Sequence, residues 1–415
     1  MATDNKENII IIGGGIIGCT TAYYLTRHPT YDPAKHNITL VEATSIAGGA
    51  SGKAGGLLAL WAYPSCLVPL SYRLHSELAA EHNGQERWGY RRIHCGELSA
   101  KGRLAGSATN GSTTTKGAEG DSTPLPKRSK AALETLRAAG IPKDLDWFAP
   151  DCVQSYDSMG DPENTAQVHP YQFTTAMAAL AEEKGANMIL GTVTSLNISS
   201  PSSSTPTIDS VTYTPKDSSS PTTLPASTII LAAGPWSRTV YPPAPISALR
   251  AHSITIRPSR PVSAYALFTQ VSIPASKGAG AAQIASPEIY ARPNNEVYAC
   301  GEGDTIVPLP STTTDVQVDE KRCADIVRAV TSMSEELRDG EVTARQACYL
   351  PQVSGVGVSG PLIGKTGVTG LVMAAGHTCW GIQNGPGTGK VVSEIVFEGK
   401  AKSANVKSLD PSKIM

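Results

Sequence analysis

A glycine-rich turn near the start of the chain has the residue spacing of a dinucleotide-binding site. Gly13, Gly15 and Gly18 follow the apolar run 9–12 and precede a helix-like stretch. Gly13 would permit the tight turn, Gly15 would let backbone N–H groups approach a pyrophosphate, and Gly18 would let helix and strand pack closely. Glu42 ends the next apolar segment, where an acid can accept hydrogen bonds from a ribose hydroxyl. The pattern predicts dinucleotide binding; the alternative is a glycine-rich turn without a ligand.

Two later segments have the pattern of buried strands that end in small residues. The apolar runs 227–234 and 370–376 both close on glycine, which is typical of strands in a central parallel sheet. After the second run, Pro386 and the surrounding glycines predict the start of a helix that extends to about Glu398. The free N–H groups at such a start favour a polar or negative partner. The alternative is a glycine-rich loop before a surface helix.

Composition and charge narrow the class of partner. The 415 residues have a formal net charge of -1, so we expect no broad basic surface for nucleic acid. No stretch reaches the roughly 18–20 apolar residues that span a bilayer. The first strand is expected after seven mostly polar residues, which leaves no room for a cleavable presequence. The C-terminal residues 413–415 do not match the usual peroxisomal signal. We expect a cytoplasmic protein with small-molecule partners. The sequence does not indicate whether the protein forms oligomers.

The eight cysteines are scattered along the chain without CxxC spacing or accompanying histidines. This distribution argues against a zinc site and against a disulfide framework. We therefore predict no metal site and reduced thiols, most of them buried.

The length of the chain exceeds that of a single typical core, so two domains are expected. Two stretches, 105–122 and 199–225, are rich in Ser, Thr, Gly and Pro. Such composition buries little apolar area. We predict that both stretches are low-complexity surface loops inserted between structured elements.

Taken together, these motifs resemble the D-amino-acid oxidase and glycine oxidase (DAO) superfamily of flavoproteins, which also includes sarcosine and fructosyl amino acid oxidases. The resemblance covers nearly the whole length apart from the two low-complexity stretches. Within this group the chain looks most similar to a fungal branch of FAD oxidoreductases. The segments that carry the resemblance are the fingerprint through Glu42 and residues 48–58, 232–236, 346–351 and 376–389.

The resemblance implies an α/β fold in which a Rossmann-like FAD-binding domain is interrupted by a mixed α+β substrate domain, as in glycine oxidase. The FAD-binding domain would comprise residues 1–84, 149–246 and 343–415. The substrate domain would comprise residues 85–148 and 247–342.

The resemblance also implies that the dinucleotide is FAD. Glu42 would hold the adenosine ribose, Val193 would supply backbone contacts to adenine, and the helix near Pro386 would stabilise the negative charge of reduced flavin. For Cys348 two interpretations stay open: a thiol bonded covalently to the flavin, as in sarcosine oxidases, or a buried cysteine. The residues implied to bind FAD are Gly13, Gly15, Ile16, Ile17, Gly18, Glu42, Ala43, Ala50, Ser51, Gly52, Lys53, Gly55, Gly56, Leu57, Val193, Ala233, Gly234, Trp236, Cys348, Gly376, His377, Gly381, Ile382 and Gln383.

A predicted hairpin in the substrate domain carries candidate catalytic residues. Segments 288–292 and 296–300 alternate in polarity around a turn. Tyr290 matches the position where relatives place a tyrosine over the substrate, although an ordinary aromatic on a sheet face fits equally. Arg292 would share that face and would contact a substrate carboxylate or be solvated. Lys53 is a third candidate, because oxidases need a positive charge near the flavin as superoxide forms; a contact to phosphate or solvent is its alternative role.

Two arginines of the glycine oxidase pattern are absent from this chain. Relatives use them to clamp the amino acid carboxylate. The corresponding positions here are Leu350 and Cys379. Either another cation takes over, Arg292, Arg257 or Arg345, or the substrate is a different amine.

The predicted function is that of an FAD-dependent oxidoreductase acting on an amine or amino acid. It would oxidise a C–N bond by hydride transfer to flavin N5, leaving an imine, with dioxygen as the final acceptor. The alternative is a flavin-binding protein with an interaction or regulatory role and little or no amino acid oxidase activity.

Overall fold

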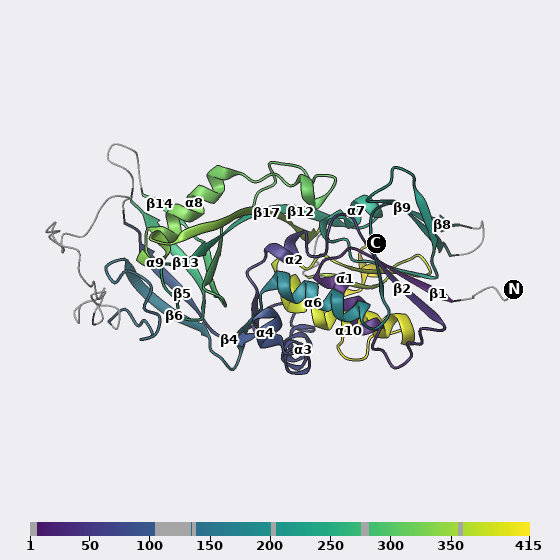
Figure 1. Ribbon diagram of the computed structural model, residues 1–415, viewed down its shortest axis with the longest axis horizontal. Coiled ribbons are helices and arrows are strands. Elements are labelled where there is room, and N and C mark those ends of the chain that lie inside the picture. The colour runs from purple at the N-terminus through teal and green to yellow at the C-terminus, as the bar shows by residue number, and fades with distance from the viewer. Residues whose placement is uncertain (1–5, 104–133, 135–137, 201–204, 275–281, 356–359) are drawn as a thin grey trace, which may run out of the picture.

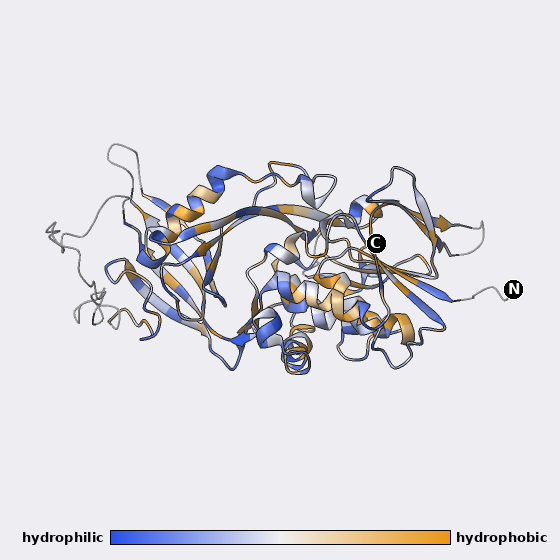
Figure 2. Ribbon diagram, viewed as in Figure 1, coloured by the Kyte–Doolittle hydropathy of each residue, from blue (hydrophilic) through white to orange (hydrophobic). Residues whose placement is uncertain are grey.

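A computed structural model of the protein describes residues 6–103, 134, 138–200, 205–274, 282–355 and 360–415. The molecule is elongated, with one large sheet toward each end and a group of helices beside the first sheet (Figure 1). Apolar residues concentrate in the strands and in the helices beside the first sheet (Figure 2).

The first sheet is built around β1 (Glu7–Ile12), which is apolar on both faces. Ile9 and Ile11 face one buried cluster, whereas Ile10 and Ile12 face a second cluster on the other side of the sheet. Burial of both faces is the usual state of a parallel strand, and β1 is parallel to both of its neighbours. In spatial order the strands are β10 (Thr222–Pro225), β9 (Thr207–Pro215), β8 (Asn187–Ser199), β2 (His36–Glu42), β1, β11 (Thr228–Leu231), β19 (Leu371–Ala375) and β18 (Leu362–Lys365).

Helices cover the face of this sheet to which Ile9 and Ile11 point. Helix α1 (Ile16–Leu25) packs against α6 (Pro170–Glu182) and α10 (Gly381–Glu398), and α3 (Val68–Glu81) packs against α10. The remaining helices of the described ranges are α2 (Ala50–Lys53), α4 (Gly84–Trp88), α7 (Ser237–Val240), α8 (Glu320–Thr331) and α9 (Glu335–Arg338). None of the helices in these ranges is long and apolar enough to cross a bilayer.

The second sheet is mainly antiparallel and has its own core. Residues Ile289 and Ala291 on one face pack with Ile326 and Val330 of α8. In spatial order its strands are β17 (Glu341–Val353), β12 (Ile246–Arg257), β16 (Glu296–Cys300), β15 (Glu288–Arg292), β13 (Tyr265–Ile273), β5 (His94–Lys101) and β6 (Val153–Gly160), with β14 (Gln283–Ala285) paired to β13; a third sheet holds β3 (Leu57–Ala59), β7 (Thr165–Gln167) and β4 (Arg91–Arg92).

The prediction of a surface loop over 199–225 is wrong. β8 extends to Ser199, and β9 and β10 form an antiparallel ribbon with it. Ile208, Val211 and Tyr213 of β9 are buried in the second cluster of the first sheet. The Ser, Thr and Pro content concealed an alternation of apolar and β-branched residues, which fits a half-buried strand. The other predicted loop, 105–122, lies outside the described residues.

The sheets also bear on the predicted division into domains. β6 and β17 belong to the second sheet, although the predicted boundaries placed 149–246 and 343–415 with the FAD-binding domain. β17 pairs with β12 along nearly its whole length, so its backbone hydrogen bonds tie it to the second sheet. The domain boundaries themselves stay a prediction.

Pro386 lies inside α10 and not at its start, which is Gly381. A proline has no N–H to donate to the carbonyl four residues earlier, and that carbonyl belongs to Ile382. The ring of His75 on α3 is its partner instead, with 2.9 Å between Nε2 and the Ile382 oxygen. The donor must be Nε2–H, because a carbonyl oxygen only accepts. His75 therefore supports the first turn of α10 and ties it to α3.

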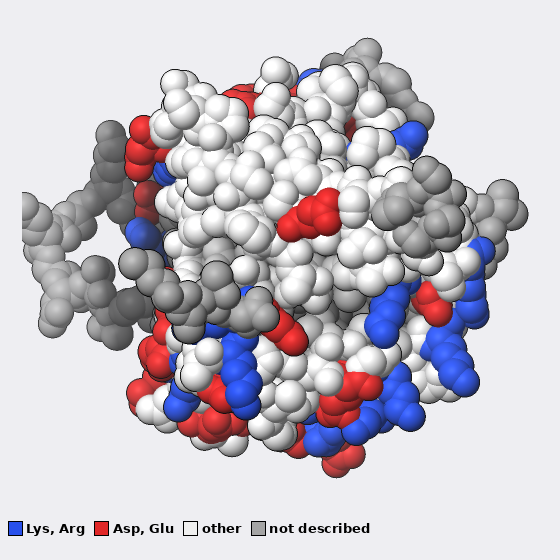
Figure 3. Space-filling view, turned by 90° about the vertical axis from the view of Figure 1, so that its right-hand side faces the viewer, with Lys and Arg blue, Asp and Glu red and all other residues white. Residues whose placement is uncertain are grey.

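One end of the molecule, formed by β8 and β9, is shown in Figure 3. Basic and acidic side chains lie interspersed along its lower part, and the upper part displays few charges. The described residues on this face therefore form no continuous positive patch.

Acid should weaken the fold through His75. Burial lowers the pKa of His75 from its usual 6.5 to about 4. The unfolded chain binds the proton more readily between these values, so stability is complete above pH 6.5 and is lost as the pH falls toward 4. We expect a loss on the order of 1–2 kcal/mol from this group between pH 7 and pH 5.

The variant His75→Gln keeps an N–H for the Ile382 carbonyl but does not titrate. Urea unfolding at pH 7 and pH 5 should give a smaller stability difference for this variant than for the native chain. Equal differences in the two proteins would contradict the role given to His75.

Candidate functional site

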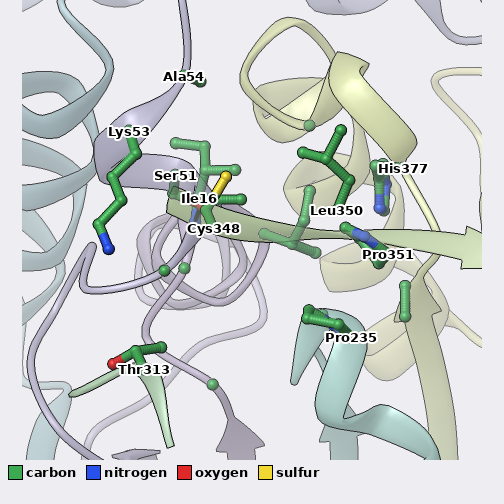
Figure 4. A pocket seen from close by; sticks show the side chains of 18 of the residues that line it. Ile16, Ser51, Lys53, Ala54, Pro235, Thr313, Cys348, Leu350, Pro351 and His377 are labelled. Atoms are coloured by element: carbon green, nitrogen blue, oxygen red, sulfur yellow. Dashed lines mark hydrogen bonds between the residues drawn. The ribbon is translucent and has the colours of Figure 1, made fainter. Parts of the chain in front are cut away.

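A cavity of about 540 Å³ lies between the two large sheets. One wall is made by residues just beyond the carboxyl ends of β1, β2, β11 and β19. In open α/β sheets this edge is where ligands bind. The other wall is a face of the second sheet, including Cys348 and Leu350 on β17, as Figure 4 shows.

The turn after β1 is shaped by backbone contacts that only glycine allows. Gly13 has a φ of +112°, and a Cβ atom there would lie 2.5 Å from the Ala232 oxygen. A Cβ on Gly18 would lie 1.9 Å from the Gly13 oxygen. The turn therefore packs directly against both the residue after β11 and the first turn of α1.

The start of α1 faces the cavity with little capping of its own. The N-cap is Gly15, which has no side chain to accept a hydrogen bond. The Ile16 N–H donates to the Ser51 hydroxyl over 2.9 Å, and Ile17 also lines the cavity. A helix start with backbone N–H groups turned to a cavity favours a phosphate.

Glu42 is held at the same edge by the turn itself. Its Oε2 accepts from the Gly14 N–H at 2.7 Å and its Oε1 accepts from the Thr44 N–H at 2.9 Å. Glu42 also lines the cavity. Its carboxylate is thus oriented by backbone donors and lies where it can accept from a hydroxyl of a bound ligand.

Most residues that the sequence implicates in FAD binding line this one cavity. They are Gly13, Gly15, Ile16, Ile17, Glu42, Ala43, Ala50, Ser51, Lys53, Gly55, Gly56, Leu57, Val193, Ala233, Gly234, Trp236, Cys348, Gly376, His377, Gly381 and Ile382.

Three of the residues implied to bind FAD are not among those that line the cavity: Gly18, Gly52 and Gln383. A Cβ on Gly52 would lie 2.2 Å from the Ala47 oxygen, so this glycine serves packing. Gln383 is buried, and its Oε1 accepts from the Ala59 N–H at 2.8 Å. These contacts shape the loop and strand around the cavity; that these residues contact FAD stays a prediction.

The cavity fits an extended dinucleotide such as FAD. Gly234 has a φ of +53°, and a Cβ there would meet nothing within 4 Å, so the backbone borders open space. Gly381 and Ile382, at the start of α10, line the same space, and the N-cap Trp380 gives that helix no side-chain cap. Helix starts α1 and α10 can thus serve negative charge at two places. His377 stays neutral, because burial lowers its pKa to about 3.

Alternate residues of the hairpin β15–β16 turn the same face to the cavity. Glu288, Tyr290, Tyr298 and Cys300 all line it. The Tyr290 hydroxyl donates to Oε2 of Glu288, and the Cys300 Sγ lies 3.8 Å from the same oxygen. The rings of Tyr290 and Tyr298 stack with centroids 5.8 Å apart. Burial raises the pKa of Tyr290 well above its usual range, so the phenol stays protonated.

Arg292 does not line the cavity, and its surroundings match neither of its two predicted roles. The side chain is buried, and its guanidinium donates to the carbonyls of Ala54 and Gly55 and pairs with Glu296 at 2.8 Å. Neither a carboxylate clamp nor a solvated side chain describes it. Arg292 instead anchors the loop after α2 to the second sheet.

Lys53 and Cys348 both line the cavity, and Lys53 binds the residue before Cys348. Lys53 donates from Nζ to the Ala347 carbonyl over 2.9 Å, and burial lowers its pKa. Burial raises the pKa of the Cys348 thiol to about 11, against the opposing effect of Lys53. In Figure 4 Cys348 lies between Lys53 on one side and Leu350 on the other.

Both positions where relatives carry an arginine line the cavity, as Leu350 and Cys379. No arginine lines it within the described ranges. Arg257 and Arg345, the other candidates, pair with Glu341 and Glu320 on the outside of the sheet. None of the three candidate arginines therefore lines the cavity, and Lys53 is the only Lys or Arg among the described lining residues.

Sequence reasoning missed several lining side chains, above all Glu288, Tyr298, Phe268 and Trp380. Glu288 could have been predicted, because it precedes Tyr290 by two residues and strand alternation places both on one face. Phe268 comes from β13, and only the pairing of β13 with β15 brings it there. Within the described chain, no group of three or more His, Cys, Asp or Glu side chains is arranged to hold a metal ion.

The glycine turn, the carboxylate after β2 and the cavity at the sheet edge define a nucleotide-binding oxidoreductase fold, and comparisons identify the family. The sequence profile of the family "FAD dependent oxidoreductase" (DAO) matches residues 8–395. The chain belongs to this family, so it is an FAD-dependent oxidoreductase.

Individual proteins are similar to this chain in sequence or in fold. The "Putative oxidoreductase TDA3" of Saccharomyces cerevisiae is 36% identical over 503 residues, covering 99% of this chain and 95% of that protein. Glycine oxidase from Bacillus cereus superposes with a TM-score of 0.68 at 17% identity, over 99% of this chain and 100% of that one. Glycine oxidase from Geobacillus kaustophilus gives 0.67 at 18% identity, over 99% and 100%. The fold is thus that of glycine oxidase.

Proposed function

We propose that the protein oxidises a C–N bond of a small amine or amino acid, passing a hydride to flavin N5 and the electrons on to dioxygen. The observation that carries this proposal is the continuity of the cavity. A single space joins the glycine turn and Glu42 at one end to Glu288 and Tyr290 at the other. A cofactor and a small substrate can therefore meet inside one site.

Bound FAD supplies the hydride acceptor, and the chain supplies binding, orientation and exclusion of water. The start of α1 and Glu42 would hold the pyrophosphate and the ribose. The start of α10 would lie near the flavin ring, where its dipole stabilises negative charge. Lys53 would provide a positive charge for the reaction with dioxygen, which the lining position of this residue supports. The names of the structural relatives, two glycine oxidases, support a C–N bond as the target.

The alternative is a flavin-binding protein that has an interaction or regulatory role. The absence of the two arginines favours this alternative only if the site no longer binds a substrate. The carboxylate of Glu288 and the hydroxyl of Tyr290, which line the cavity, favour a site that still binds a substrate.

The test is anaerobic reduction of the bound flavin by a panel of D-amino acids, N-methyl amino acids, glycated amino acids and amines. We expect at least one compound to bleach the flavin absorbance, and air to restore it with release of one peroxide per cycle. A flavin that no compound reduces would favour the alternative role.

A second arm separates the two halves of the cycle. Lys53→Met should slow reoxidation by dioxygen about tenfold, roughly 1.4 kcal/mol, while the pH-independent rate of flavin reduction changes less. Lys321→Met, in an exposed lysine of α8, serves as the control. Equal reoxidation rates in Lys53→Met and the native protein would remove Lys53 from this role.

We also infer that the FAD is held without a covalent bond. A thiol is nucleophilic as the thiolate, and burial keeps Cys348 protonated. Denaturation in acid should therefore release all flavin from the polypeptide. Flavin that stays with the native chain but leaves the Cys348→Ser variant would contradict this inference.

A further inference from the structure

The substrate end of the cavity contains a half-buried carboxylate that has no cationic partner among the described residues. Glu288 is half-buried and lines the cavity. Its partners in the described structure are the Tyr290 hydroxyl and the Cys300 thiol, both neutral and both on Oε2. No Lys, Arg or His of the described ranges forms an ion pair with it. A carboxylate placed like this is costly unless a positive charge or a proton joins it.

The cations of the cavity lie elsewhere. Lys53 is the only Lys or Arg among the described lining residues, and its ammonium donates to the Ala347 carbonyl near Cys348. His377 is neutral. Leu350 and Cys379, which also line the cavity, carry no charge. The only charge that a described side chain can carry at the substrate end is therefore negative, and that charge opposes the entry of a second carboxylate.

Aromatic rings surround the same region. Tyr298 stacks on Tyr290, which meets Phe268 edge to face with centroids 6.4 Å apart. Trp61 joins Phe268 to Trp380 through contacts of 6.1 Å and 5.7 Å. Aromatic faces attract ammonium groups and also accept the alkyl or aryl groups attached to them. One carboxylate inside an array of rings is the usual arrangement for recognising an organic ammonium ion.

From these features we infer that the substrate is an amine that enters as an ammonium ion and carries no carboxylate, held by Glu288 and the surrounding rings. The inference rests on the proposed C–N bond oxidation and names its substrate class. It separates this chain from the amino acid chemistry of its structural relatives.

Glu288 also gives the bound ammonium a route to the reactive form. Hydride can leave the carbon next to nitrogen only when the nitrogen lone pair is free. An N–H proton passes to a carboxylate oxygen of Glu288, which leaves a neutral amine and a neutral carboxyl. Burial raises the pKa of Glu288, which favours this transfer. Tyr290, bonded to Oε2, holds the carboxyl group in position.

The experiment compares matched pairs of ligands that differ by one carboxylate. The pairs are pyrrolidine and proline, phenethylamine and phenylalanine, and N-methylbenzylamine and N-methylphenylglycine, with both enantiomers of each amino acid. Binding to the FAD-loaded protein is measured without oxygen by calorimetry, and flavin reduction is followed by absorbance. The variants are Glu288→Gln, Glu288→Asp and Glu341→Gln, the last an exposed glutamate at the start of β17.

At least one amine should bind ten times more tightly than its carboxylated partner. Glu288→Gln should weaken that binding at least tenfold, Glu288→Asp should restore part of it, and Glu341→Gln should change nothing. The inference is overturned if the amino acids bind as tightly as the amines, if Glu288→Gln binds amines normally, or if no ligand binds.

The two proposals fail in different ways. If amino acids reduce the flavin and the amines do not bind, the substrate class is wrong and C–N bond oxidation stands. If amines bind through Glu288 but never reduce the flavin, recognition by Glu288 stands and the proposed oxidation is wrong.

Discussion

The close approach of three backbone segments at Gly13 is the constraint on which the rest of the site depends. The turn after β1 touches the residue after β11 through Gly13 and the first turn of α1 through Gly18. With side chains there, β1, β11 and α1 would be forced apart. Because glycine allows the three segments to touch, the ends of the parallel strands and the start of α1 converge on one space. Glu42 is fixed at the same place by the N–H of Gly14.

The second sheet forms the opposite wall of this space and lines it with side chains. Its face supplies Glu288, two stacked tyrosines and Cys348, while Arg292 ties the hairpin to the loop around Gly55. The position of Arg292 shows how a charged residue can act as a brace between sheets, since its guanidinium satisfies two carbonyls and one carboxylate. The nucleotide end is thus built from backbone, and the substrate end from side chains. This division lets the side chains of the second sheet vary without disturbing the nucleotide end.

The nucleotide end was predictable from sequence because its requirements are local. Gly13, Gly18 and Glu42 follow fixed spacings along one βαβ unit. The hairpin 288–300 was predictable as well, since alternation and a turn define it. The ribbon β8–β9–β10 was hidden by its Ser and Thr content. The roles of Arg292 and Phe268 depend on contacts between segments far apart in the chain, as does the bond between His75 and Ile382 that supports the helix containing Pro386. No spacing rule reports such contacts.

We propose that one cavity between the two sheets holds FAD from the β1 turn to the start of α10. Hydrogen–deuterium exchange of the flavin-free protein, with and without added FAD, tests it most directly. We expect slower exchange in four separate segments, 13–18, 48–57, 232–236 and 374–382, when FAD is present. Protection limited to 13–18, with 48–57 and 374–382 unchanged, would contradict it.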